Sequence, residues 1–193
     1  MDHIHLVDYD SAWPLMFAAE AARVSSALPR GLVLAIEHFG STAIPNMVAK
    51  PIIDLLVAVR SIQEARETAV GPMEALGYAF WSDNPRRDRL FFVKGLPPAA
   101  PHRTHHVHMT ELNGDLWHRL LFRDYLRCHP DEAQRYAALK RSLAAQHRHD
   151  REAYTAAKSD YVDAVMAKAA TEASQAKKEK QIAPSNKPLH AFW

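Results

Sequence analysis

The chain has 193 residues, of which 48% are hydrophobic, and this suits one globular domain with a core of its own. Its formal net charge of +2 is too small for a strong nucleic-acid or membrane field, and no apolar run approaches the roughly 20 residues that cross a bilayer. The single cysteine, Cys128, excludes an intrachain disulfide and a four-cysteine zinc site. We therefore expect a cytoplasmic enzyme or binding protein with no membrane partner.

The first half of the chain alternates short apolar runs with helical patterns. In order we expect a strand at 4–7, a helix that ends before Pro29, strands at 32–36 and 52–59, and a helix at 62–76. Asp10 suits the cap of the first helix and Pro14 suits its first turn. Gly71-Pro72 should disturb the second helix near its end.

The second half places strands before helices. We expect strands at 78–81, 90–93 and 104–110, and then helices at 113–127, 131–147 and 151–170. From Thr171 the composition turns to Ala, Lys, Glu, Gln, Pro and Ser, which indicates a disordered tail at 171–193 after a single domain at 1–170. The order predicts an α/β (α+β) fold, with a mixed β-sheet flanked by helices and a carboxyl-terminal helical cover.

Residues 37–59 carry the strongest chemical signal. Gly40-Ser41 follows an apolar run and precedes residues 46–49, which can form one helical turn. Backbone N–H groups in such a turn can converge on an anion, and the hydroxyls of Ser41 and Thr42 add donors. A plain turn capped by Ser or Thr is the alternative.

Asp54 lies inside the apolar strand 52–59, where a carboxylate is costly to bury unless it is paired or holds a cation. Leu56 stands on the same face where a second acid would complete a metal site. The candidates for that acid elsewhere in the chain are Glu37, Glu111 and Asp124. The alternative is a buried ion pair with Lys50 or with an arginine from residues 86–89.

His106 and His108 point to the same side of their strand, because strand side chains alternate. Two imidazoles at this spacing can share a metal or contact a phosphate. Zinc takes three or four ligands, so a structural or substrate-contact role stands beside the metal role.

Arg119, Arg123 and Arg127 recur every four residues and form a basic stripe on one helix. Such a stripe can hold a phosphate or a carboxylate through paired N–H groups. The alternative is a solvated face on which Asp115 and Asp124 are the partners.

These motifs together resemble the GrpB family over roughly residues 5 to 170. The resemblance rests on HFGSTAIP at 38–45, KPIIDLLVAV at 50–59, HVHM at 106–109, LLFRDYLRCHP at 120–130 and EAQRYAALKRSLAAQHRHDREAYTAAKSDYV at 132–162. It implies a nucleotidyltransferase-like fold in which Gly40 and Ser41 match a phosphate-binding turn and Asp54 matches a metal-binding acid. Some relatives have a second acid at the position of Leu56. GrpB-like domains also occur fused to dephospho-CoA kinase, where they are regarded as accessory to folding.

The resemblance favours a nucleotidyltransferase-like protein that binds a nucleotide or another phosphorylated small molecule, with possible Mg-dependent nucleotidyl transfer. Asp54 is the expected catalytic and metal-binding residue, and His106 and His108 contact substrate or metal. The expected phosphate contacts are Gly40, Ser41, Thr42, Lys50, Arg87, Arg89 and Arg123. The alternatives are a non-catalytic accessory or ligand-binding protein, favoured by Leu56, and a hydrolase built on a histidine-bound metal.

Overall fold

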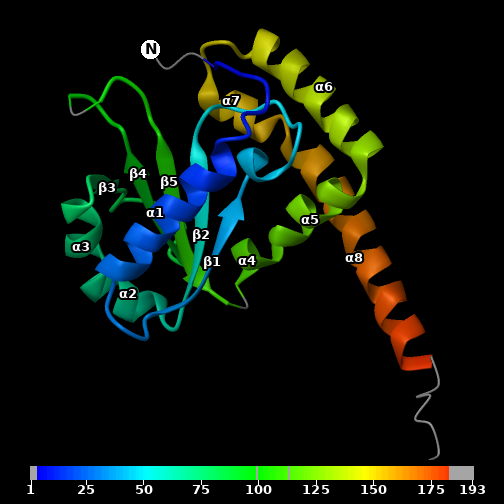
Figure 1. Ribbon diagram of the computed structural model, residues 1–193. Coiled ribbons are helices and arrows are strands. Elements are labelled where there is room, and N and C mark those ends of the chain that lie inside the picture. Colours follow the sequence, from blue (N-terminus) through cyan, green and yellow to red (C-terminus); the bar gives the residue numbers. More distant parts are fainter. Residues whose placement is uncertain (1–3, 99, 113, 183–193) are drawn as a thin grey trace, which may run out of the picture.

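The structure is a computed structural model that describes residues 4–98, 100–112 and 114–182. Its centre is a five-stranded mixed sheet with the strand order β1-β2-β5-β4-β3 (Figure 1). The strands are β1 Val33–Phe39, β2 Ile53–Val59, β3 Tyr78–Phe80, β4 Arg89–Lys94 and β5 His105–Glu111. Strands β2 and β5 run parallel, and the other neighbouring pairs are antiparallel. This is the mixed sheet that the sequence predicts.

The helices divide into two groups around the sheet. Helices α1, α2 and α3 cover one face, whereas α5 to α8 lie beyond the β1–β2 side of the sheet (Figure 1). The helices are α1 Trp13–Ala27, α2 Ile62–Thr68, α3 Val70–Ala75, α4 Asp115–His118, α5 Leu120–Cys128, α6 Pro130–Gln146, α7 Arg151–Ala156 and α8 Ser159–Ile182. The second group is the expected carboxyl-terminal helical cover.

The main core lies between the sheet and α1 to α3. Val24 and Leu28 of the α1 segment are buried, and Phe17 and Ala21 pack against the same cluster, as the helical spacing predicts. Strand β2 is almost entirely buried because the sheet is covered on both sides at this point. Each large side chain buried here stabilises the fold by about 1.5–3 kcal/mol.

A second apolar cluster joins the carboxyl-terminal helices to the segment that follows Gly40. Ile44 and Met47 pack against Leu126, Tyr136 and Val165, which come from α5, α6 and α8. The helical cover is therefore attached to the loop between β1 and β2, where the sequence places its strongest chemical signal.

Several expected elements differ from the structure. The strand at 4–7 is a single bridge, Val7 to Ala49. The helix at 62–76 is divided into α2 and α3, and Pro72 lies in the first turn of α3, where its missing N–H costs nothing. The helices expected at 113–127 and 151–170 are also each divided in two, although Asn113 lies outside the described residues.

Helix α8 continues to Ile182, so helix occupies the first part of the segment 171–193 that the composition assigns to a disordered tail. Alanine, lysine, glutamate and glutamine have high helix propensity, and no glycine or proline interrupts this stretch. Residues 183–193 lie outside the described part of the chain.

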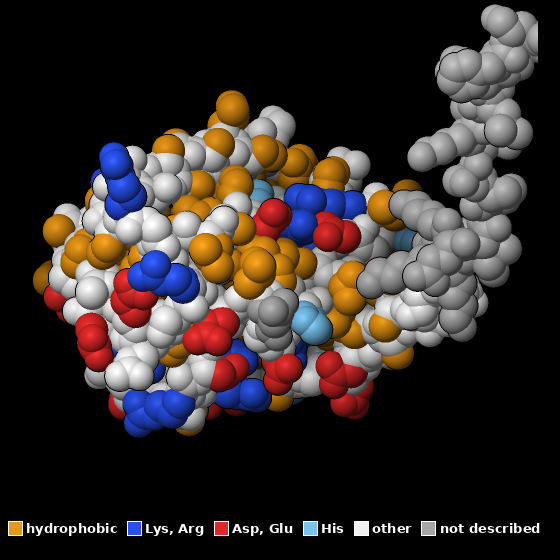
Figure 2. Space-filling model, turned by 90° about the horizontal axis from the view of Figure 1, so that it is seen from below, with side chains coloured by type: hydrophobic (Ala, Val, Ile, Leu, Met, Phe, Trp, Pro, Cys, Tyr) orange, Lys and Arg blue, Asp and Glu red, His pale blue; other side chains and the backbone are white. Residues whose placement is uncertain are grey.

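Among the described residues, no helix is long and apolar enough to cross a membrane. Acidic, basic and hydrophobic side chains are interspersed over the end of the molecule shown in Figure 2. This mixed surface agrees with the small net charge of the chain.

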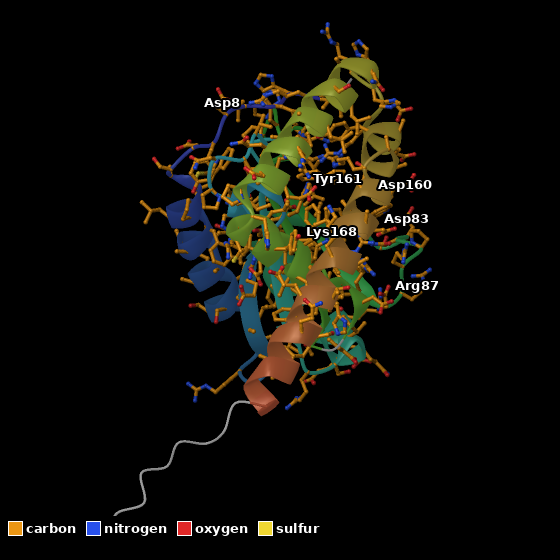
Figure 3. The ribbon with its side chains drawn as sticks, turned by 90° about the vertical axis from the view of Figure 1, so that its right-hand side faces the viewer. Asp8, Asp83, Arg87, Asp160, Tyr161 and Lys168 are labelled. Atoms are coloured by element: carbon orange, nitrogen blue, oxygen red, sulfur yellow. The ribbon has the colours of Figure 1, made fainter. Side chains whose placement is uncertain are left out.

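A polar contact fastens α8 to α6. Glu132 of α6 accepts hydrogen bonds from Tyr161 Oη at 2.6 Å and from Lys168 Nζ at 2.8 Å. Figure 3 shows Tyr161 and Lys168 along the length of α8. This contact fixes α8 beside α6, and so positions the side chains at the start of α8 that enter the site.

Candidate functional site

Strands β2 and β5 bring an acid and two histidines together. Asp54 is the register partner of His106, and Leu56 is the partner of His108. Paired residues on neighbouring strands share a face, and so do alternate residues along one strand. Asp54, His106 and His108 therefore project from one face of the sheet, opposite the face that α1 covers.

The three side chains lie at the spacing of metal ligands. Asp54 Oδ1 is 3.0 Å from His106 Nδ1 and 3.7 Å from His108 Nε2. One ligand atom from each residue lies within 4.8 Å of the other two. Two ligands of a tetrahedral zinc ion are about 3.4 Å apart. A carboxylate and two imidazoles at these distances fit a metal ion, and the sequence predicts these three residues as metal or substrate contacts.

The carboxylates considered as a second acid are engaged elsewhere. Glu37 accepts a hydrogen bond from Arg123 Nη1 at 2.7 Å, and Asp124 accepts one from Arg123 Nε at 2.7 Å. Glu111 accepts from the backbone N–H of Ile62. Within the described residues, the group around Asp54 is completed by histidines of β5, and not by a second acid.

Burial and mutual contact set the protonation of this group. Burial raises the pKa of Asp54, but the hydrogen bond with His106 and the interactions with His106 and His108 outweigh it and hold that pKa far below its usual value. Burial lowers the pKa of His108, although Asp54 opposes this. An ionised carboxylate and a neutral imidazole are the forms that coordinate metals.

The Gly-Ser turn lies directly against the carboxylate. Gly40 has a φ of 71°, and a Cβ atom added there would approach Asp54 Oδ2 to 2.5 Å. Only glycine adopts this positive φ without strain and also avoids the clash. The predicted anion-binding turn and the predicted acid are therefore neighbours in space.

The Thr42 hydroxyl makes hydrogen bonds within the protein. Thr42 Oγ1 donates to the carbonyl oxygen of Ile52 at 3.4 Å and lies 3.0 Å from His38 Nε2. Because the hydroxyl proton is already committed, His38 Nε2–H is the donor in the second bond. Burial lowers the pKa of His38 to about 4, so this imidazole is neutral at physiological pH. Thr42 lines the site cavity but also ties the turn to the strands.

The arginine stripe of α5 holds the turn from its other side. Arg123 Nη1 donates to the carbonyl oxygen of His38 at 2.8 Å as well as to Glu37. Arg127 Nε donates to the carbonyl oxygen of Ala43 at 2.9 Å. Guanidinium groups thus bind the backbone on both sides of the Gly40-Ser41 turn. Asp124 pairs with Arg123 and Arg127, as the second alternative for the stripe expects, whereas the contacts with backbone carbonyl groups belong to neither alternative.

A cavity of about 320 Å³ opens beside Asp54 and His106. Gly40 and Ser41 form part of its wall, and most of the remainder comes from the segment 49–52, from α6 and α7, and from Lys158 in the turn between α7 and α8. Four basic residues line it: Lys50, Lys140, Arg151 and Lys158. Among the expected phosphate contacts, Lys50 therefore lies in this cavity together with Gly40, Ser41 and Thr42.

Sequence reasoning missed Lys140 and Lys158. Each follows a buried tyrosine, Tyr136 or Tyr154, by four residues, so each shares the inward side of its helical segment. Lys158 Nζ lies 4.1 Å from the centroid of the Tyr154 ring, and Lys140 Nζ donates to the carbonyl oxygen of Val48. A lysine at helical spacing from an inward tyrosine is the signal that could have identified them.

The environment of the two lysines disfavours their charged forms. Burial, followed by the charges of Lys158 and Lys50, lowers the pKa of Lys140 to about 7. Burial lowers the pKa of Lys158 to about 8, although Asp54 opposes this. An anion placed between them would raise both pKa values and would be bound in return.

Arg87 and Arg89 do not line this cavity. Arg89 Nη2 lies 2.7 Å from Asp88 Oδ2, and its charge helps to lower the pKa of His108. Arg87 is exposed on the loop between β3 and β4, at the margin of the molecule in Figure 3. Their predicted phosphate role stays a prediction.

A smaller cavity of about 210 Å³ adjoins the first. The two share six lining residues: Phe39, Gly40, Ser41, Tyr136, Thr155 and Lys158. The smaller cavity adds Phe122 and Val162, together with Ser159, Arg119 and Arg123.

The chain is similar to known proteins over most of its length. The sequence model of the family described as "GrpB protein" matches residues 3–168. The chain is 48% identical to "UPF0157 protein PA4798" of Pseudomonas aeruginosa over 87% of its own length and 68% of that protein. It is 30% identical to a "Dephospho-CoA kinase" of Mycolicibacterium paratuberculosis, over 80% of this chain and 43% of that protein.

The fold is also that of a solved structure. The crystal structure of the conserved protein GrpB from Enterococcus faecalis superimposes with a TM-score of 0.77 at 32% identity. The match covers 87% of this chain and 98% of that chain.

Proposed function

The chain belongs to the GrpB family, and we propose that it binds a phosphorylated small molecule next to a divalent metal ion. Asp54, His106 and His108 would hold the metal, and Lys140 and Lys158 would hold the phosphate. One observation carries this proposal: a three-residue metal-ligand group opens onto a cavity lined by four basic residues. A metal ion and basic side chains that face the same small cavity are the usual arrangement for binding a phosphoryl group.

The donor set favours a transition-metal ion. Magnesium prefers six oxygen ligands, whereas this group offers two imidazole nitrogens and one carboxylate. Imidazole suits zinc, iron, nickel and copper, and a mixed nitrogen and oxygen set is typical of catalytic zinc sites. The magnesium expected from the resemblance stays a prediction, and we propose zinc as the ion to test first.

The residues of the cavity would share the work of phosphoryl-group chemistry. A bound metal would polarise a phosphoryl oxygen and lower the pKa of a coordinated water. Lys158 and Lys140 would offset the negative charge that develops on the phosphoryl oxygens. Gly40 allows the turn to approach the carboxylate, and His38, Arg123 and Arg127 hold the turn in place. Hydrolysis or transfer of a phosphate ester, including nucleotidyl transfer, is the reaction class that fits these parts.

Binding without turnover is the second candidate. Leu56 is fully buried, and the described residues bring no second acid to Asp54, so the group can position only one metal ion. The dephospho-CoA kinase relative extends well beyond the matched 43%, which favours an accessory role for such domains. In this case the cavity would retain its ligand and release it unchanged.

Calorimetric titration with pyrophosphate, with and without zinc or magnesium, tests the proposal. Zinc should strengthen binding in the wild type, and Asp54→Asn should remove that effect. Lys158→Met should weaken binding by about tenfold, because it removes a charge-assisted contact. Arg30→Met, which removes an exposed cation elsewhere, is the matched control.

The two candidates separate in a second assay. Release of phosphate or of a nucleotide product by the zinc-loaded protein, lost in Asp54→Asn, would support the reaction. Tight binding with no product would support the second candidate. If pyrophosphate does not bind with any metal, the proposed function is wrong.

A further inference from the structure

The smaller cavity differs from the metal cavity in chemistry. Its walls are mainly aromatic and aliphatic: Phe39, Phe122, Tyr136 and Val162. Phe122 and Tyr136 meet edge to face at 5.1 Å between ring centroids, which gives the cavity a rigid aromatic corner. The basic residues that crowd the metal cavity, Lys50, Lys140 and Arg151, do not line this one.

The charged groups of the smaller cavity are partly neutralised. Arg123 bonds to Glu37 and Asp124, and its side chain is only 9% exposed. Arg119 is exposed and lies at the rim of the cavity. Thr155 and Ser159 are also exposed and offer hydroxyl groups there. An apolar floor with a hydrogen-bonding rim suits an organic group that carries a few polar atoms.

The two cavities are continuous. Ser41, Tyr136 and Lys158 line both, so one ligand can occupy the two together. Phe39 also lines both, and it is the register partner of Asp54 across β1 and β2. The aromatic part of the site therefore begins one strand away from the metal group. A ligand that spans this distance has its phosphate attached directly to the organic group, without a long linker.

We propose that the smaller cavity holds the organic group of a phosphate ester whose phosphate occupies the metal cavity. The preferred ligand is then a compact aromatic or heterocyclic phosphate, which binds more tightly than inorganic phosphate or pyrophosphate. This inference rests on the proposed function for the phosphate end, and it adds the class of group attached to that phosphate.

Calorimetry on the zinc-loaded protein tests the inference with three probes: inorganic phosphate, phenyl phosphate and adenosine 5′-monophosphate. Burial of an aromatic group should make at least one ester bind about tenfold or more tightly than inorganic phosphate. Val162→Trp fills the smaller cavity and should reduce this gain to less than about threefold. It should leave the affinity for inorganic phosphate unchanged.

Two further variants keep the test decisive. Ala164→Trp places the same ring on the exposed side of α8 and should keep the full gain. Ser159→Trp blocks the cavity from an exposed position, so it serves if Val162→Trp unfolds. If inorganic phosphate binds but the esters bind no more tightly, or if the gain survives both blocking variants, the inference is overturned and the proposed function stands. If none of the three probes binds the wild type, both are overturned.

Discussion

The two faces of the sheet bury polar groups in opposite ways. On the face covered by α1 to α3, the carboxylate of Glu20 is matched by Lys94 Nζ at 2.7 Å and by Tyr78 Oη at 2.9 Å. On the other face, burial lowers the pKa values of Lys140 and Lys158 to about 7 and about 8, and nearby positive charges, Lys158 and Lys50 for Lys140 and Arg151 for Lys158, add to the effect. Like charges held together in a buried place destabilise a fold, so their presence on this face supports the proposed ligand site.

The largest loss of stability should follow a change on the face that α1 to α3 cover. Phe92 is fully buried in the main core, and Phe92→Ala should lower the free energy of unfolding by about 3–5 kcal/mol. Chemical denaturation measures this loss. The exposed Trp81→Ala, at the end of the neighbouring strand, is the control and should change stability by less than about 1 kcal/mol.

Gly40→Ala tests the second face. The added methyl group would lie 2.5 Å from Asp54 Oδ2, so the turn or the carboxylate must move. We expect zinc affinity to fall by about 100-fold, because a displaced ligand group no longer fits one metal ion. Gly71→Ala is the matched control, since a Cβ atom there meets nothing within 4 Å. Equal zinc affinity in the two variants would contradict the placement of Asp54 in the metal site.

Lys140→Met should stabilise the protein at pH 6 by about 1–2 kcal/mol, because it removes a buried cation. The folded wild type binds fewer protons than the unfolded chain between pH 7 and 10.5, since burial lowers the pKa of Lys140 from 10.5 to about 7. Stability of the wild type should therefore rise with pH across this window.

Lys140→Met should lack this rise, and denaturation curves at several pH values measure it. Arg30→Met is the control, and it should follow the wild type at every pH. A variant less stable than the wild type at pH 6 would show that Lys140 supports the fold, against the comparison of the two faces.

Tyr154→Phe should have the smallest effect. Tyr154 Oη is buried, and it has no hydrogen-bond partner among the described residues. Removing the hydroxyl should leave stability unchanged or raise it by up to about 1 kcal/mol. Thermal unfolding measures this change, and a clear loss of stability would mean that the hydroxyl has a partner in solution.

The sequence predicts the helices and strands better than it predicts which of them pair or pack together. Alternation along a strand is enough to put His106 and His108 on one side, and the apolar run of β2 is enough to bury Asp54. The parallel pairing of β2 with β5 joins residues about fifty positions apart, and no local pattern encodes it. Leu56 leaves β2 without a second acid beside Asp54, and the pairing places two histidines of β5 there instead.

The basic half of the site was missed for a different reason. A lysine on a helix is usually solvated, so no local pattern distinguishes Lys140 and Lys158, whereas the cluster of arginines at 86–89 is visible in the sequence. Only the packing of α6, α7 and α8 over the Gly-Ser turn shows that these lysines point inward. Helix α8 also extends past residue 170. The sequence does not predict this, because the same composition occurs in helices and in disordered tails.

Metal content tests whether Asp54, His106 and His108 form a metal site. The purified protein would be loaded separately with zinc and with magnesium, dialysed, and analysed by mass spectrometry for bound metal. We expect one zinc ion per wild-type chain, little retained magnesium, and no bound zinc in His108→Ala. Equal zinc retention by the wild type and His108→Ala, or none in the wild type, would contradict this metal site.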